Sequence, residues 1–155
     1  YKQTDAFFRG IDFDVRLKPI QHFEYHLLSG LIWANEKRTG NYLPYIPSAR
    51  FDHDLTWEDI RVGKANAWLQ LKHRLVLKQT RFHPASDLID FTPPTYNLFG
   101  FEAGIEWPLS RQNKLRMLLS ADNLFNKEYK EYTNRSRYYA HDMGRDVRFS
   151  VGWFF

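Results

Sequence analysis

The stretch Ile11-Asp12-Phe13-Asp14-Val15-Arg16-Leu17-Lys18 alternates apolar and charged side chains without a break. Successive side chains of a β-strand point to opposite faces of a sheet, so this stretch predicts a strand with one dry face and one wet face. The same period of two recurs about seven times along the chain. In the other segments every second residue is apolar in the ranges 23–33, 51–57, 67–77, 99–107, 115–121 and 147–155, with a serine or histidine at a few positions. No position of this apolar phase holds Asp, Glu, Lys or Arg, although 26% of the chain is charged. The pattern therefore predicts seven amphipathic strands.

The connections between these segments alternate in length. Short turns follow the first, third and fifth segments, at 19–22, around 61–64 and at 108–113. Long polar and aromatic loops follow the second, fourth and sixth segments, at 35–49, 79–94 and 126–144. Short turns on one rim and long loops on the other are typical of barrels in the bacterial outer membrane. No linker interrupts the pattern, so residues 1–155 are expected to form one structural unit.

The composition agrees with a membrane barrel and excludes other classes. The 155 residues are 17% aromatic, yet the mean hydropathy is −0.57. A polar average with many aromatics fits strands of which only alternate residues meet lipid, and no apolar run is long enough for a transmembrane helix. The absence of cysteine excludes disulfides and thiolate metal sites. A net charge of +4 without a basic run gives no reason to expect a nucleic-acid partner.

Alternation alone also fits a soluble β-sandwich or a lipocalin-like barrel. Three features favour the membrane. First, the chain stops on an aromatic residue in the apolar phase. Second, seven strands are an odd number, whereas bacterial single-chain barrels have even numbers of strands. The chain is therefore expected to be part of a larger barrel, and the lack of a signal peptide in its first residues suits a mature or incomplete chain. Large aromatics also stand near strand ends in the apolar phase, as in interfacial girdles: Phe23, Trp33, Trp57, Trp107, Trp153 and Phe155.

Two histidines, His53 and His73, count against the membrane because they fall in the phase that would face lipid. A neutral imidazole costs less there than a full charge. We expect these residues to lie near a membrane interface or at a β-bulge.

Four short elements resemble those of a known family. The run Asp122-Asn123-Leu124-Phe125-Asn126-Lys127-Glu128-Tyr129 is similar to the "N-L-F-(D/N)-K-x-Y" element at the end of the penultimate strand of TonB-dependent outer-membrane receptors. Met143-Gly144-Arg145-Asp146-Val147 resembles the entry to their last strand, which ends in Phe, as here at Phe155. The ranges 43–50 and 8–12 resemble their "L-P-x-I-P-x-x-R" and "(Y/F)-R-G-x-E" elements, with Asp12 in place of Glu. The order and spacing of all four elements agree.

The resemblance implies an all-β, antiparallel transmembrane barrel of 22 strands with a plugged lumen, of which this chain is about the last seven strands. It implies a receptor of the bacterial outer membrane that imports an iron–siderophore, haem or cobalamin, with the cargo itself unidentified. The implied partners are outer-membrane lipid and lipopolysaccharide, an N-terminal plug domain absent from this chain, the TonB complex reached through that missing part, and the barrel-assembly machinery. The alternatives are a soluble all-β module that binds a ligand or carbohydrate, and a barrel enzyme such as an outer-membrane phospholipase or protease.

No catalytic constellation, metal-binding pair or cofactor motif is present in the sequence, so we expect no enzyme and no resident cofactor. His83 and His141 lie in long loops, and His141 follows Tyr138 and Tyr139; such residues can ligate haem iron, although they more often decorate an external loop. The same loop mixes Arg135 and Arg137 with tyrosines. It could grip an anionic aromatic ligand such as a catecholate siderophore, or it could be a solvated loop whose arginines meet lipopolysaccharide phosphates. The wet-face charges are expected to form a hydrated network facing the plug: Asp12, Asp14, Glu102, Glu106, Arg116, Asp122 and Arg148.

Overall fold

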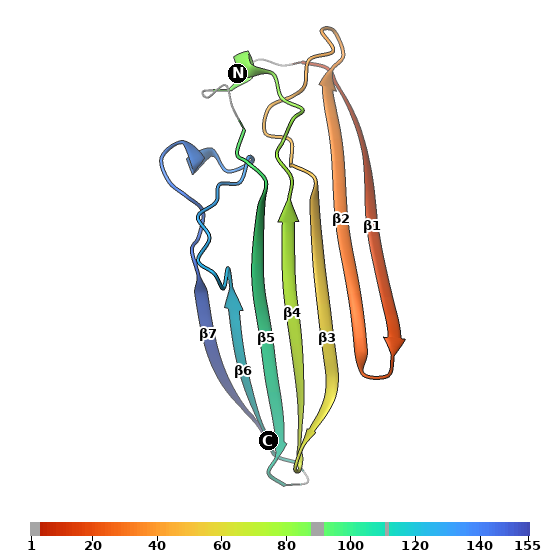
Figure 1. Ribbon diagram of the computed structural model, residues 1–155, viewed down its shortest axis with the longest axis vertical. Helices are drawn as coiled ribbons and strands as arrows, with labels where there is room; N and C mark the ends of the chain where they lie inside the picture. The colour runs from red at the N-terminus through yellow and green to blue at the C-terminus, as the bar shows by residue number, and fades with distance from the viewer. Residues whose placement is uncertain (1–3, 88–91, 111) are drawn as a thin grey trace.

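The computed structural model describes residues 4–87, 92–110 and 112–155, and in these ranges seven strands form one antiparallel sheet. Each strand pairs only with its neighbours in the sequence, so the sheet is a simple meander (Figure 1). Two 3-10 turns, η1 (Pro84–Ser86) and η2 (Arg135–Tyr138), lie in the loops. The predicted all-β class is confirmed. The strands are β1 (Ala6–Ile20), β2 (Phe23–Glu36), β3 (Arg50–Val62), β4 (Ala65–Val76), β5 (Tyr96–Pro108), β6 (Lys114–Asp122) and β7 (Asp146–Phe154).

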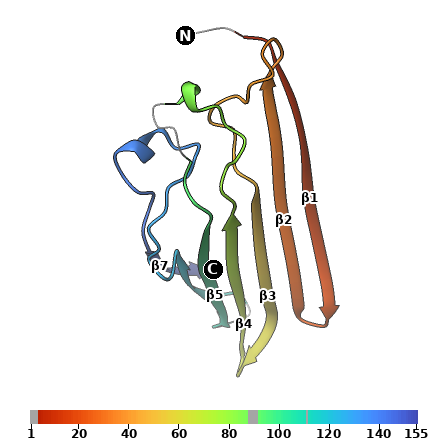
Figure 2. The same ribbon diagram turned by 45° about the horizontal axis from the view of Figure 1, so that its top comes forward.

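The predicted alternation of short turns and long loops is confirmed in the described ranges. Residues 37–49, 77–95 and 123–145 connect strands at one end of the sheet, which we call the long-loop rim (Figures 1 and 2). The C-terminus lies at the opposite, short-turn rim. Residues 1–3, part of the second long loop and one residue of the turn before β6 lie outside the described residues. Across those that are described, no helix has the length and apolarity needed to cross a membrane.

Several strands extend beyond the limits that alternation predicted, most of all β1 at the long-loop rim and β3 at the short-turn rim. Two register shifts interrupt the ladders, between Leu17 and Ile20 and between Trp57 and Ile60. Both lie at the short-turn rim, and the second contains Asp59 with a φ of 56°. A bulge of this kind bends the strand and increases its twist locally.

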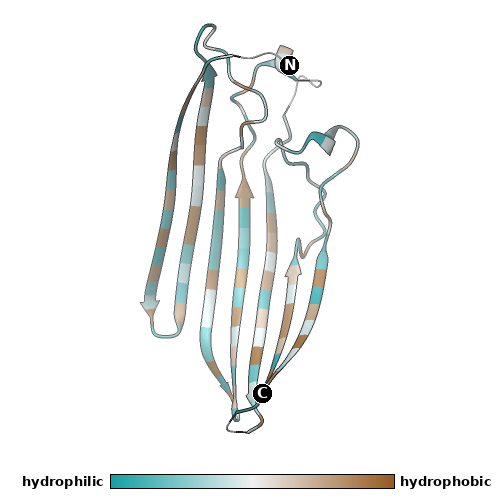
Figure 3. Cartoon of the chain, turned by 180° about the vertical axis from the view of Figure 1, so that it is seen from behind, coloured by the Kyte–Doolittle hydropathy of each residue, from teal (hydrophilic) through white to brown (hydrophobic). Residues whose placement is uncertain are grey.

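The apolar phase keeps to one face of the sheet and stays uncovered by the rest of the chain. Phe13 is 55% exposed and Leu71 is 49% exposed, as are many of their neighbours on this face. The strands show the alternation as bands of opposite hydropathy (Figure 3). A single layer of sheet cannot bury its own apolar face, and an apolar surface of this extent needs a cover of lipid or protein.

The opposite face carries ion pairs that cross from strand to strand. Arg74 Nε lies 2.6 Å from Asp52 Oδ1, and Lys72 Nζ lies 3.3 Å from Glu102 Oε2. Five of the other six predicted wet-face charges, all except Asp12, continue the series: Asp14 is hydrogen-bonded to His26, Glu106 pairs with both Lys114 and Arg116, and Asp122 pairs with Arg148. Side chains of opposite charge facing one another across a ladder stabilise the register of the strands.

His53 and His73 lie on the apolar face, as predicted, and their polar atoms have partners. They pair directly across β3 and β4, with ring centroids 5.3 Å apart in a stacked arrangement. His53 Nδ1 lies 2.7 Å from the Tyr25 hydroxyl, and His73 Nε2 lies 2.9 Å from Asn97 Oδ1. Neither histidine is at a bulge, which leaves the other expected place, near a membrane interface; both stand three residues from the long-loop end of their strands. Because each ring is hydrogen-bonded, its cost on an apolar surface is reduced.

Candidate functional site

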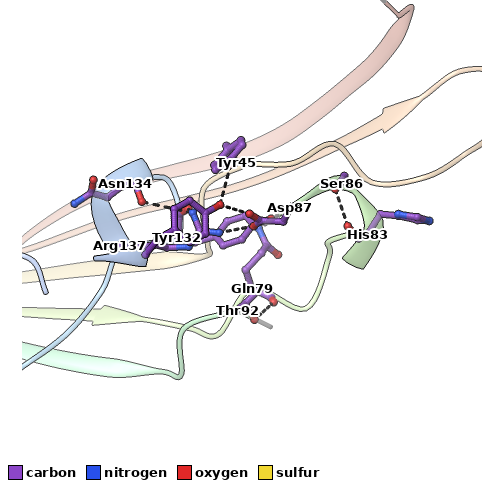
Figure 4. A network of polar contacts seen from close by, with 10 residues as sticks. Tyr45, Gln79, His83, Ser86, Asp87, Thr92, Tyr132, Asn134 and Arg137 are labelled. Atoms are coloured by element: carbon purple, nitrogen blue, oxygen red, sulfur yellow. Dashed lines mark hydrogen bonds and ion pairs between the residues drawn. The ribbon is translucent and has the colours of Figure 1, made fainter. Parts of the chain in front are cut away.

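The three long loops meet above the sheet in a polar and aromatic cluster, which we call the loop network (Figure 4). It joins Tyr45 of the first loop, Asp87 of the second loop, and Tyr132, Arg137 and Tyr138 of the third loop. The Tyr45 and Tyr138 hydroxyls are 2.9 Å apart, and the Tyr45 and Tyr132 rings stack at 6.2 Å. Residues that are distant in the sequence thus hold the loops to one another.

A buried ion pair lies at the centre of the loop network. Arg137 Nη2 contacts Asp87 Oδ2, and the two side chains are only 2% and 0% exposed. Arg137 Nη1 also donates to the carbonyl oxygen of Tyr132 at 2.8 Å. The guanidinium carbon lies 4.5 Å from the ring centroid of Tyr138 and 4.8 Å from that of Tyr132. The charge is therefore compensated by a carboxylate and by aromatic faces.

The Tyr138 hydroxyl donates to Asp87 Oδ1 and accepts from Tyr45. Burial, followed by the hydrogen bond to Asp87, raises the pKa of the Tyr138 hydroxyl well above its usual range. The hydroxyl consequently stays protonated at physiological pH and keeps its role as donor to the carboxylate.

The predicted ligand contacts divide into buried and exposed residues. Arg137 is buried in the loop network and Tyr138 is half-buried there, and the polar groups of both contact Asp87. Arg135 is exposed, with its guanidinium carbon 5.2 Å from the Tyr45 ring centroid. Tyr139 is 89% exposed, and its ring meets that of Tyr138 edge-on. The exposed residues form the part of the rim that is open to a ligand.

The two predicted loop histidines are not brought together by any recorded contact. His83 precedes η1, and its side chain points away from the loop network (Figure 4). His141 is exposed beside a cavity of about 200 Å³, which Tyr129 and Lys130 also line. Within the described ranges, no group of three or more His, Asp or Glu side chains is placed to hold a metal ion.

The motif that begins at Asn123 closes the base of the third long loop. Asn123 adopts a φ of 47°, and its buried amide donates to the carbonyl oxygens of Lys127 and Met143 at 2.9 and 3.3 Å. Its Oδ1 accepts from the Lys127 N–H at 2.8 Å. Leu124 N donates to the carbonyl oxygen of Phe99 at 2.7 Å. The Asn123 side chain thus ties the two ends of the loop to each other, and the backbone of Leu124 ties the loop to the sheet.

The other motif residues complete this closure. Asn126 Oδ1 accepts from the Arg145 N–H at 2.9 Å, and a Cβ on Gly144 would lie only 2.8 Å from the same oxygen. Phe125 contacts Phe99 edge-on at 5.5 Å, and Tyr129 packs on Tyr96 at 4.8 Å. Phe155, which follows β7, is almost fully exposed at the short-turn rim. The motif residues therefore shape the loop, and the structure shows them in contact with the sheet and with each other.

Sequence reasoning missed three residues that organise the rim: Tyr45, Gln79 and Asp87. Gln79 is 1% exposed, and its amide donates to the carbonyl oxygens of Ile46 and Pro47 at 2.9 and 3.0 Å. No periodicity marks such loop residues, and Asp87 stands 50 residues before its partner Arg137. The only available signal was the accumulation of aromatic and charged residues in all three loops.

The sheet and its loop-bearing rim define a segment of the wall of a large β-barrel. A scan against protein-family models and a search of curated proteins gave no match. Among solved structures, the chain is similar to the copper transporter OprC, with a TM-score of 0.72 and 21% identity, over 97% of this chain and 24% of that chain. It is also similar to BauA, the ferric preacinetobactin receptor from Acinetobacter baumannii, with a TM-score of 0.74 and 20% identity, over 97% of this chain and 22% of that chain.

Both of these proteins are TonB-dependent receptors. At this level of identity the likeness shows the fold, and it agrees with the family that the sequence motifs resemble. The chain spans about a quarter of the length of either protein. The expectation that it forms part of a larger barrel fits this coverage.

Proposed function

We propose that this chain is part of the barrel wall of a TonB-dependent receptor that imports a scarce nutrient across the bacterial outer membrane. The observation that carries the proposal is the division of a single-layer sheet into an exposed apolar face and an ion-paired face. Lipid covers the apolar face, and the ion-paired face lines the lumen, next to a plug domain supplied by another part of the protein. Import is driven through the TonB complex, which contacts that other part.

The long-loop rim faces the outside of the cell and contributes to ligand capture. Three observations support this role: the loop network fixes the three loops as one unit, Arg135 and Tyr139 are exposed on it, and the cavity beside His141 is lined by Lys127 and Lys130. Cationic and aromatic groups of this kind suit an anionic, aromatic cargo such as a catecholate siderophore. β7, with Phe155 beyond it, serves as the terminal strand that the assembly machinery recognises.

The soluble alternative is less favoured because it requires a cover for the apolar face, and no described segment of the chain provides one. The enzyme alternative is less favoured because the one hydroxyl–carboxylate pair described in the loop network, Tyr138 with Asp87, is tied up by the ion pair of Asp87 with the buried Arg137. The charged members of the network pair with each other or with backbone oxygens.

Cell fractionation tests the proposal. An antibody against this segment is used on membrane and soluble fractions of the source cells, with boiled and unboiled samples on a denaturing gel. We expect a band several times larger than 18.6 kDa in the outer-membrane fraction, with a mobility that changes on boiling. A band of 18.6 kDa in the soluble fraction would contradict the proposal and support a small binding module.

A further inference from the structure

An arginine, Arg9, stands on the apolar face of the sheet near the long-loop rim. It pairs with Trp33 across β1 and β2, and no register shift separates it from Ile11 and Phe13, so all three share that face. Arg9 is exposed, and its guanidinium carbon lies 5.8 Å from the Trp33 ring centroid. A cation is very costly against the middle of a bilayer and much less so at its surface, where headgroups and water are available. Arg9 therefore belongs at the level of the headgroups.

A second arginine reaches the same tryptophan from the loop after β4. The guanidinium carbon of Arg81 lies 5.3 Å from the Trp33 ring centroid. Its position is fixed by the buried Gln79, whose Oε1 accepts from the Arg81 N–H at 3.0 Å while its amide holds the first loop. The arrangement is thus built from three separate segments of the chain and anchored by a buried side chain.

Both arginines lack a negative partner in the part of the chain that the structure describes. Neither makes an ion pair with a carboxylate there, and Arg81 Nε is buried without a hydrogen-bond acceptor. Two like charges on one aromatic ring repel each other, and an unpaired buried donor carries a desolvation cost. An anion with several acceptor oxygens would remove both penalties.

We propose that Arg9, Trp33 and Arg81 form a binding site for the phosphorylated sugar headgroup of an outer-leaflet glycolipid. The inference rests on the proposed outer-membrane location. The planar guanidinium donors match phosphate oxygens, and the indole offers an amphipathic surface for the sugar at the membrane interface. The exposed side chains of Ile11 and Phe13 follow on the same face, toward the short-turn rim. They receive the acyl chains, which is why a glycolipid suits the site better than free phosphate.

The test uses the whole protein that contains this chain, extracted from outer membranes in a mild detergent. Binding of bisphosphorylated lipid A and of its dephosphorylated form is measured by native mass spectrometry. The variants are Arg9→Gln, Arg81→Gln and the double substitution. Arg61→Gln at the opposite, short-turn rim is the matched control, since the outer-leaflet glycolipid does not reach that rim.

We expect the affinity for the phosphorylated lipid to fall about tenfold for each arginine and on the order of a hundredfold for the double variant, because each loses hydrogen bonds to a charged group. Binding of the dephosphorylated lipid and the behaviour of Arg61→Gln are expected to stay unchanged. Heat-modifiable mobility on a gel confirms that each variant is folded.

Equal binding of the phosphorylated lipid by the double variant and the unsubstituted protein would overturn the inference. Competition by inorganic phosphate as strong as that by lipid A would also overturn it, because the site would then be one for free anions. A protein that fractionates outside the outer membrane would instead refute the proposed function, so the two failures are distinguishable.

Discussion

The buried pair of Asp87 and Arg137 gives the most demanding prediction about the rim. Replacing Asp87 with asparagine keeps the volume of the side chain but leaves the Arg137 charge without its counterion, in a site where the two side chains are 0% and 2% exposed. Breaking a buried pair by removing one partner costs about 3–5 kcal/mol. At about 1.4 kcal/mol for each factor of ten, the opening equilibrium of the loop network should increase between roughly a hundredfold and a few thousandfold. The increase in opening cannot exceed the factor at which the loop network is fully open, which is set by the free energy that holds the network closed in the unsubstituted protein.

Amide hydrogen exchange of the whole protein in detergent measures this opening directly. Protection of the backbone between Tyr132 and Ala140 is expected to fall by the stated factor, while protection of the strands is unchanged. Arg148→Gln serves as the control. It removes the ion pairs of Arg148 with Asp122 and Asp146, whose shared arginine side chain is 60% exposed, and an exposed pair is worth only about 0–1 kcal/mol. Loss of protection in the loops of this control is expected to be undetectable.

Two results would refute the reasoning. One is wild-type protection of the loops in Asp87→Asn, which would mean that the ion pair does not hold them together. The other concerns a double variant with Asp87→Leu and Arg137→Met. This variant removes both charges, and we expect it to recover most of the protection that Asp87→Asn loses. A double variant as open as Asp87→Asn would show that the charge imbalance is not the cause.

Three further predictions follow from the geometry. Burial raises the pKa of the Tyr138 hydroxyl, so the folded loops favour its neutral form. The loop network therefore keeps its stability below the ordinary tyrosine pKa of about 10 and loses it as the pH rises above that value. Protease cleavage of the loops should accelerate over that pH range, and Tyr138→Phe should weaken this acceleration, with the remainder due to Tyr129 and Tyr132, whose pKa values burial also raises. Gly104→Val should reduce the yield of folded, heat-modifiable barrel severely, because even a Cβ there would lie 2.0 Å from the ring of Trp68. Leu71→Lys on the apolar face should destabilise the protein by about 2–4 kcal/mol in lipid vesicles if that part meets the middle of the bilayer, as urea unfolding followed by tryptophan fluorescence would measure, whereas Gln70→Lys on the opposite face should change it little. Equal effects of these two lysines would contradict the assignment of the faces.

The strands and their faces were predictable because they depend on a local pattern, the alternation of apolar and polar residues along each strand. Alternation fixes which residues share a face, and the short turns between consecutive segments fix the register of each hairpin. The stacking of His53 on His73 follows from that register, yet the phase alone gave no reason to expect the hydrogen bonds from Tyr25 and to Asn97 that make the pair tolerable. The bulge beyond Trp57 depends on the backbone of Asp59 and left no mark in the hydrophobic pattern.

The rim was predictable in composition but not in contacts. The sequence placed Arg137 and Tyr138 in an external loop and suggested that they meet a ligand, whereas the structure shows Arg137 buried and Tyr138 half-buried against another loop. Such contacts join segments tens of residues apart, and they depend on how the loops fold over the sheet. Neither periodicity nor motif spacing carries that information. The exposed Arg135 and Tyr139 stay as predicted ligand contacts.

The meander order of the sheet has a consequence for how the protein is made. Every strand contacts only the strand before it and the strand after it, so each new pairing closes only the loop between consecutive strands, which costs less entropy than pairing distant segments of the chain. Growth can then be processive: each added strand satisfies the exposed edge of the last one and offers a new edge in its place. Such a sheet needs no folding nucleus built from contacts distant in the sequence. A partly formed sheet always ends in a strand with an unpaired edge, and the next strand can pair with it.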